Sequence, residues 1–202
     1  QIEPAGARHG DAAGDGQRVQ IEAARPAEPP VKPHDGPAAE LEIAREVQQK
    51  FFPKFTPQLP GLTLAGRCLP AREVSGDFFD FLPMAEFSMD VVVGDISGKG
   101  ISAALLMASL QSAIRAQPPL ATDPHFTEAR RLATLMHVLN RHLYILTPPE
   151  KFATLCYLSL QADHRRVSYC NAGHETPLRI SANGTVDRLC DGGTVLGAFP
   201  EM

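Results

Sequence analysis

Two short segments of the chain carry the residues best suited to chemistry, and each combines an aspartate with glycines. Glu73–Asp80 contains Asp77, and Gly94–Gly100 contains Asp95. Each aspartate lies beside an apolar run that predicts a β-strand. Carboxylates at the rim of a rigid sheet offer hard oxygen ligands, and small neighbours let backbone carbonyls approach an ion. The pair is therefore predicted to hold Mg²⁺ or Mn²⁺, which can activate water for phosphoryl hydrolysis.

Two other interpretations of these segments compete with a metal site. Either aspartate alone is more typical of a turn or a helix cap, and the occurrence of two on neighbouring strands is what favours a metal site. Gly94–Gly100 could also be a phosphate-binding P-loop. That interpretation is rejected because only three residues separate Gly94 from Gly98, and Gly100 follows Lys99 where a P-loop has a hydroxyl for Mg²⁺.

Three further residues receive weaker predictions. Asp80 could orient a water in the site, and a turn-stabilising role is an equal alternative. Lys99 could offset negative charge near the site, although a solvated side chain is the more common outcome for an exposed lysine. His174, in the run Asn171–Pro177, has the chemistry of a general acid, but a structural role between a strand and a turn is favoured.

The elements that must position these residues follow from apolar spacing. Helices are predicted over 37–52, 101–117 and 123–146, and strands over 62–69, 78–82, 89–94, 152–160, 167–171, 176–180 and 186–189. Asp123 with Pro124 marks the start of the third helix. Val91–Val93 is β-branched on both faces and predicts a central strand, and Asn183 before Gly184 predicts a hairpin turn. Segregated helices and strands indicate an α+β fold with antiparallel sheets.

Composition limits the function classes. The 202 residues have a formal net charge of −4, which gives no electrostatic reason to expect nucleic acid. No apolar run is long enough to span a membrane, no signal peptide is predicted, and the four cysteines lack zinc-ligand spacing. The cysteines are predicted to be buried, reduced thiols, and the protein to be cytoplasmic.

The first 37 residues differ from the rest of the chain. Residues 1–37 hold six of the 18 prolines and few large apolar side chains, so they are predicted to be a flexible linker. A linker there predicts an upstream sensor or regulatory domain, and a tail without a role is an equal alternative. Residues 38–202 are predicted to form the folded domain.

Five motifs together resemble one protein family. They are Glu46–Pro53, Leu69–Phe81, Gly94–Met107, Phe152–Leu155 and Asn171–Pro177. In this order and spacing they resemble the bacterial metal-dependent serine/threonine phosphatases of the PPM type (protein phosphatase 2C-like), in the SpoIIE/RsbU branch. The resemblance covers residues 40–197.

The resemblance implies an αββα sandwich, with two antiparallel sheets flanked by helix pairs. It also implies a centre of two Mn²⁺ or Mg²⁺ ions, in which Asp77 matches the bridging ligand. Asp95 matches a second metal ligand, accompanied by the backbone carbonyl of Ile96. Asp77 and Asp95 are thus the implied catalytic residues, and water activated by the ions attacks phosphorus without a phosphoenzyme. The helix over Glu42–Phe51 resembles a regulatory helix that links an upstream sensor to the site.

The implied substrates are phosphorylated anti-anti-sigma (STAS-domain) proteins, in signal transduction that controls sigma factors. A homodimer is compatible with the resemblance. Family members carry a later Thr-Asp-Gly motif and a further aspartate, which these 202 residues lack, so the domain is expected to be C-terminally incomplete. Two functions therefore stand: a metal-dependent protein serine/threonine phosphatase, or a catalytically inactive regulatory or scaffolding module of the same fold.

Overall fold

The computed structural model describes residues 36–69, 74–117, 127–148, 150–162 and 166–201. The elements are α1 (Pro37–Gln49), β1 (Phe78–Ala85), β2 (Ser88–Ile96), α2 (Ile101–Arg115), α3 (Glu128–Leu146), β3 (Ala153–Gln161), β4 (Arg166–Ala172), β5 (Leu178–Ile180) and β6 (Val186–Arg188). The predicted linker lies outside the described residues, apart from its last two positions.

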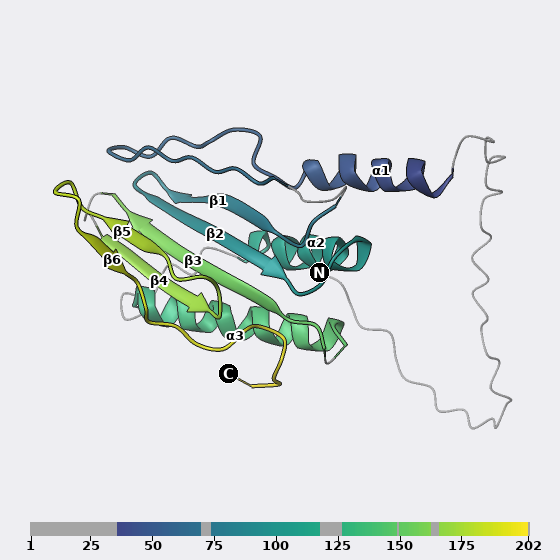
Figure 1. Ribbon diagram of the computed structural model, residues 1–202. Helices are drawn as coiled ribbons and strands as arrows, with labels where there is room; N and C mark the ends of the chain where they lie inside the picture. Colours follow the sequence, from purple (N-terminus) through teal and green to yellow (C-terminus); the bar gives the residue numbers. More distant parts are fainter. Residues whose placement is uncertain (1–35, 70–73, 118–126, 149, 163–165, 202) are drawn as a thin grey trace, which may run out of the picture. The chain divides into compact units, whose positions relative to one another are not determined.

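Strands β1 to β4 form one antiparallel sheet in sequence order, and β5 and β6 form a second, two-stranded sheet (Figure 1). The α+β prediction is confirmed, and the Val91–Val93 strand is central as predicted, because β2 pairs with β1 on one side and β3 on the other. The predicted turn at Asn183–Gly184 joins β5 to β6, and Gly184 there has φ +83°.

Helices α2 and α3 pack against one face of the four-stranded sheet, and this layer holds the hydrophobic core (Figure 1). Helix α3 buries Leu132, Leu135, Leu139 and Leu143 at helical spacing, as the sequence predicts, while Leu146 is half exposed. Each such leucine contributes about 2 kcal/mol through burial. The core therefore holds the helices firmly on the sheet whose end carries the aspartates.

The structure departs most from the prediction in two of the elements, while the others keep their type with shifted ends. No strand forms over 62–69. The α-carbon of Gly66 lies so close to the ring of Phe79 that a Cβ would meet it, so this segment packs on the face of β1, and within the described residues it has no partner for a hydrogen-bonded ladder. Helix α3 begins at Glu128, and Thr127 is its N-cap through a hydrogen bond from the Arg130 amide. The predicted cap at Asp123 lies outside the described residues.

The cysteines are all free, and the prediction that all are buried is wrong. Only Cys156 is fully buried, while Cys190 is exposed. Cys190 lies after β6 in irregular backbone, outside the helices and strands that bury the core. Within the described residues, no helix is both long and apolar enough to cross a membrane.

Candidate metal centre

Asp77 and Asp95 meet at one end of the four-stranded sheet. Asp77 immediately precedes β1, and Asp95 is the penultimate residue of β2. Because the two strands are antiparallel and Phe78 pairs with Gly94, the start of β1 lies beside the end of β2. The structure therefore brings together the two aspartates that the sequence singled out, together with the Ile96 backbone.

Gly76 allows the two aspartate segments to approach closely. The Ile96 amide donates a hydrogen bond to the Gly76 carbonyl (3.3 Å). A Cβ on residue 76 would lie 2.7 Å from the Ile96 carbonyl oxygen and 3.1 Å from Asp95 Oδ1. Both oxygens therefore lie close beside Gly76, and a residue without a side chain at this position is what lets the Asp77 and Asp95 segments come this near to each other.

The electrostatics of Asp77 and Asp95 also favour a cation between the two carboxylates. The pKa of Asp95 is raised by burial, by the negative charge of Asp77 and by a hydrogen bond with that carboxyl group, and the proximity of His174 opposes the rise. Two carboxylates this close repel each other when both are ionised. A divalent cation between them would remove that repulsion.

The donor set fits a hard divalent cation. Asp77, Asp95, Lys99 and the glycines at 76 and 98 line a cavity of about 260 Å³. In the part of the chain that the structure describes, no group of three or more His, Cys, Asp or Glu side chains could hold a metal. Two carboxylates and the Ile96 carbonyl would therefore hold Mg²⁺ or Mn²⁺ with water in the remaining positions, as Mg²⁺ commonly is held.

The loop after Asp95 is fastened to the start of β3. Lys99 is exposed at its tip, between Gly98 and Gly100, which both have positive φ (+103° and +75°). Lys151 Nζ donates to the Ser97 carbonyl (3.1 Å), and Ser97 Oγ accepts from the Phe152 amide (2.9 Å). This loop therefore holds Lys99 at the rim of the cavity.

Asp80 lies on the helix-facing side of β1, where it is 2% exposed. Its Oδ2 accepts from Arg115 Nε (2.6 Å) and Gln111 Nε2 (2.9 Å), and its Oδ1 accepts from the Phe81 amide. Gln111 and Arg115 also donate to the Phe51 carbonyl, just beyond α1. The structure thus places Asp80 at a junction of α1, α2 and β1.

A contact that sequence reasoning missed joins α1 to Asp77. The side-chain amide of Gln48 donates to the Ser75 carbonyl (2.7 Å) and accepts from the Ser75 amide (2.9 Å). Ser75 Oγ in turn donates to Asp77 Oδ2 (3.2 Å) and accepts from the Asp77 amide (3.1 Å). The signal in the sequence was a polar residue, Gln48, on the apolar stripe of the helix, and the structure shows it 6% exposed.

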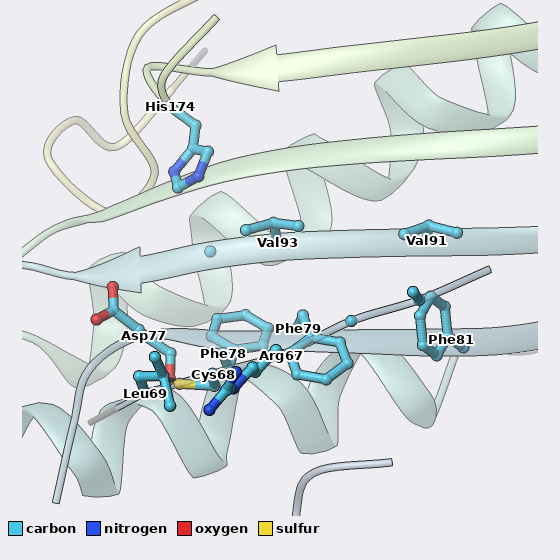
Figure 2. Close-up of a pocket in the computed structure, with 13 residues that line it drawn as sticks. Arg67, Cys68, Leu69, Asp77, Phe78, Phe79, Phe81, Val91, Val93 and His174 are labelled. Atoms are coloured by element: carbon cyan, nitrogen blue, oxygen red, sulfur yellow. Dashed lines mark hydrogen bonds between the residues drawn. The ribbon is translucent and has the colours of Figure 1, made fainter. Parts of the chain in front are cut away.

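A second hollow adjoins Asp77 on the sheet face opposite α2 and α3 (Figure 2). It measures about 420 Å³ and has an apolar floor made by Phe79, Phe81, Val91 and Val93. Asp77 and His174 both line it at the same end, Asp77 from the segment before β1 and His174 from the loop after β4 (Figure 2). The third weaker candidate, His174, is thus brought to the site, and the rest of its contacts are described below.

The fold and the acidic sheet end define a class of protein. The solved PP2C domain of SiaA from Pseudomonas aeruginosa matches this structure with a TM-score of 0.57, over 79% of this chain and 62% of that chain, at 16% identity. The RsbU and RsbW domains of a Mycobacterium tuberculosis protein match with a TM-score of 0.52 at 28% identity, over 66% of this chain and 35% of that chain. The fold is that of a protein phosphatase 2C-type domain.

Sequence comparison gives the family. Residues 86–202 match the family model described as Stage II sporulation protein E (SpoIIE), and the chain belongs to this family, in the SpoIIE/RsbU branch of the bacterial PPM-type phosphatases. It is 31% identical to phosphoserine phosphatase RsbU of Bacillus subtilis, over 68% of this chain and 38% of that protein. It is 30% identical to protein IcfG of Synechocystis, over 80% of this chain and 28% of that protein. The matched part is therefore well under half the length of these relatives.

Proposed function

We propose that this chain carries the metal centre of a protein serine/threonine phosphatase, which hydrolyses phosphoserine or phosphothreonine on a regulatory protein. The observation that carries the proposal is the convergence of Asp77, Asp95 and the Ile96 carbonyl at a glycine-lined sheet end. The family supports it, since two relatives are phosphoserine phosphatases, RsbU and RsbP of Bacillus subtilis.

In this proposal the protein's own residues hold and orient the reactants. Two divalent cations, when bound, would supply an activated water and neutralise charge on the phosphoryl oxygens. Asp77 and Asp95 are the proposed ligands, with the Ile96 carbonyl beside them. The Ser75 hydroxyl holds Asp77 Oδ2, and Ser75 is itself held by Gln48, so the carboxylate is oriented before any ion binds.

The proposed substrate is a phosphorylated anti-anti-sigma (STAS-domain) protein, and the proposed input is an upstream sensor domain acting through α1. Support for the input is the pair of contacts that tie α1 to the site segment and to α2, made by Gln48 and by the Phe51 carbonyl. On this proposal the enzyme acts in the cytoplasm, and residues 1–37 connect the sensor to the domain at 38–202.

Phosphate release from a phosphoserine-containing STAS-domain protein, with Mn²⁺ or Mg²⁺, tests the activity. We expect metal-dependent release by the wild-type protein and its loss in Asp95→Asn, with Asp187→Asn as the matched control because that aspartate lies on β6 in an exposed ion pair. Metal binding without release in the wild-type protein would instead support the alternative function, a catalytically inactive regulatory module.

A further inference from the structure

His174 is held by its backbone in a way that does not depend on its side chain. The Asn171 side chain accepts from the His174 amide (2.7 Å) and donates to the His174 carbonyl (3.0 Å). Gly173, between them, has φ +67°, which glycine adopts without strain. The turn after β4 is therefore complete without the imidazole, so the turn does not explain why a histidine stands at position 174.

The imidazole makes a separate contact beside the metal centre. His174 Nδ1 lies 2.8 Å from Thr154 Oγ1. Thr154, on β3, is the direct ladder partner of Asp95 on β2. The ring is therefore fixed next to the residue proposed as a metal ligand, and it lines the same hollow as Asp77 (Figure 2).

The Thr154 contact is coupled to the tautomer of the ring, because the hydroxyl donates to Nδ1 in one tautomer and accepts from Nδ1–H in the other. A hydroxyl can donate one hydrogen, and the structure places His174 Nδ1 at 2.8 Å from Thr154 Oγ1 as its acceptor or donor. If the hydroxyl donates to Nδ1, that nitrogen carries no hydrogen, and in the neutral ring Nε2 carries it instead. The imidazole then has one N–H donor, at Nε2. Its direction is fixed because Nδ1, on the opposite side of the ring, is hydrogen-bonded to Thr154.

We propose that His174 is a phosphate-contacting residue, whose Nε2–H donates a hydrogen bond to a phosphoryl oxygen of the substrate, and that Thr154 and Asn171 are its positioning residues. This inference rests on the proposed function, because it assigns the donor a partner in the phosphomonoester. A preoriented donor aimed at a phosphoryl oxygen contributes to transition-state stabilisation without having to reorganise. The structural explanation of His174, by contrast, requires only its backbone.

NMR of the protein with ¹⁵N-labelled histidine tests the tautomer and the contact together. We expect His174 to be the Nε2–H tautomer, with an Nε2 resonance that shifts when inorganic phosphate is added with Mg²⁺. His142 is the internal control, because its Nε2 lies 3.0 Å from Ser109 Oγ in the contact between α2 and α3. Its resonance should not move with phosphate. An Nδ1–H tautomer, or an Nε2 resonance unmoved by bound phosphate, would overturn the inference.

Two substitutions of the positioning residue sharpen the test. Thr154→Val removes the hydroxyl and keeps the shape of the side chain, so the Nδ1–H tautomer should appear and phosphate binding should weaken about tenfold, the loss of roughly one hydrogen bond. Thr154→Ser keeps the hydroxyl and should behave like the wild-type protein. If Thr154 had only a structural role, Thr154→Val and Thr154→Ser would show the same ratio of His174 tautomers.

The same titration separates failure of this inference from failure of the proposed function. If the wild-type protein binds phosphate in a metal-dependent way, and His174→Asn and Thr154→Val bind it equally well, the contact is wrong and the phosphatase proposal stands. If the wild-type protein binds no phosphate and releases none from phosphoserine, both are wrong. Circular dichroism of each variant confirms that it is folded.

Discussion

Strands β1 and β2 and the segment before them carry four aspartates that form two contrasting pairs. Asp80 and Asp90 face the helices, are almost fully buried, and each is neutralised by an arginine, Arg115 on α2 and Arg131 on α3. Asp77 and Asp95 lie at the sheet end, face each other, and have no such arginine partner within the described residues. The comparison shows that one pair joins the helices to the sheet through ion pairs, while the other pair, which is proposed to hold a cation, lies at the sheet end without such a partner among the described residues.

Substitution in the buried pair should give the largest effect, and the effect should be a loss of stability. Asp90 is fully buried and accepts two bonds from Arg131 and one from the Tyr157 hydroxyl, all between 2.8 and 2.9 Å. Asp90→Ala leaves Arg131 with Glu128 as its remaining carboxylate partner and the buried Tyr157 hydroxyl without its acceptor, so the free energy of unfolding should fall by about 2–4 kcal/mol, as measured by urea denaturation. The matched control, Asp187→Ala, breaks the exposed pair with Arg179 and should cost under about 1 kcal/mol. Equal effects would contradict the contrast.

At the sheet end, a substitution that crowds the two aspartate segments should lower both stability and metal affinity. Gly76→Ala places a methyl group 2.7 Å from the Ile96 carbonyl oxygen, so the two aspartate segments must separate. We expect a loss of about 1–3 kcal/mol in stability, typical of overpacking, together with a clear loss of Mn²⁺ affinity. Gly36→Ala is the control, because nothing lies within 4 Å of a Cβ there. Unchanged metal affinity in Gly76→Ala would show that the approach of the two segments is not needed for the site.

The contact between α1 and Ser75 gives a smaller effect. Gln48→Ala leaves the amide and carbonyl of Ser75 without their partners in a partly buried position, and it should lower the free energy of unfolding by about 1–2 kcal/mol. The neighbouring Gln49 is exposed, so Gln49→Ala should be close to neutral. Thermal unfolding of the two variants side by side decides the matter, and equal melting temperatures would show that this contact contributes nothing.

The smallest expected effect is the dependence of stability on pH, and its direction follows from the raised pKa of Asp95. The pKa of Asp95 is raised in the folded state, so the folded protein binds that proton more tightly than the unfolded chain does. This aspartate therefore opposes folding at neutral pH, and its penalty is relieved as the pH falls through the raised pKa. Without metal, Asp95→Asn should be more stable than the wild-type protein at pH 7, and the difference should vanish in acid. Urea denaturation across this pH range measures it, and a variant less stable at pH 7 would contradict the repulsion.

Local patterns predicted much of the fold and the aspartate pair. The β-branched run of β2 and the leucine spacing of α3 are signals within one element, and they gave the correct element types. The strand predicted over 62–69 did not form, because alternation shows which side chains share a face but not whether the backbone finds a partner. The aspartate pair was singled out because Asp77 and Asp95 each follow a local rule, an aspartate beside glycines at the end of an apolar run.

The arginine partners and the Gln48 contact could not be predicted in the same way. Arg131 is 41 positions from Asp90, and Arg115 is 35 positions from Asp80, so only the tertiary fold joins them. The available signal was polarity on an otherwise apolar stripe. Gln48 on α1, Gln111 on α2 and Asn140 on α3 are all such positions, and each is buried with a hydrogen bond to a distant backbone group. That signal marks a contact without naming its partner.

Calorimetric titration of this chain with Mn²⁺ tests the central claim most directly. We expect saturable binding in the wild-type protein and in Asp187→Asn, and no saturable binding in either Asp77→Asn or Asp95→Asn, since each removes one of the two carboxylates that converge at the sheet end. Binding of undiminished affinity in folded Asp77→Asn and Asp95→Asn would contradict the claim, because the ion would then be held elsewhere.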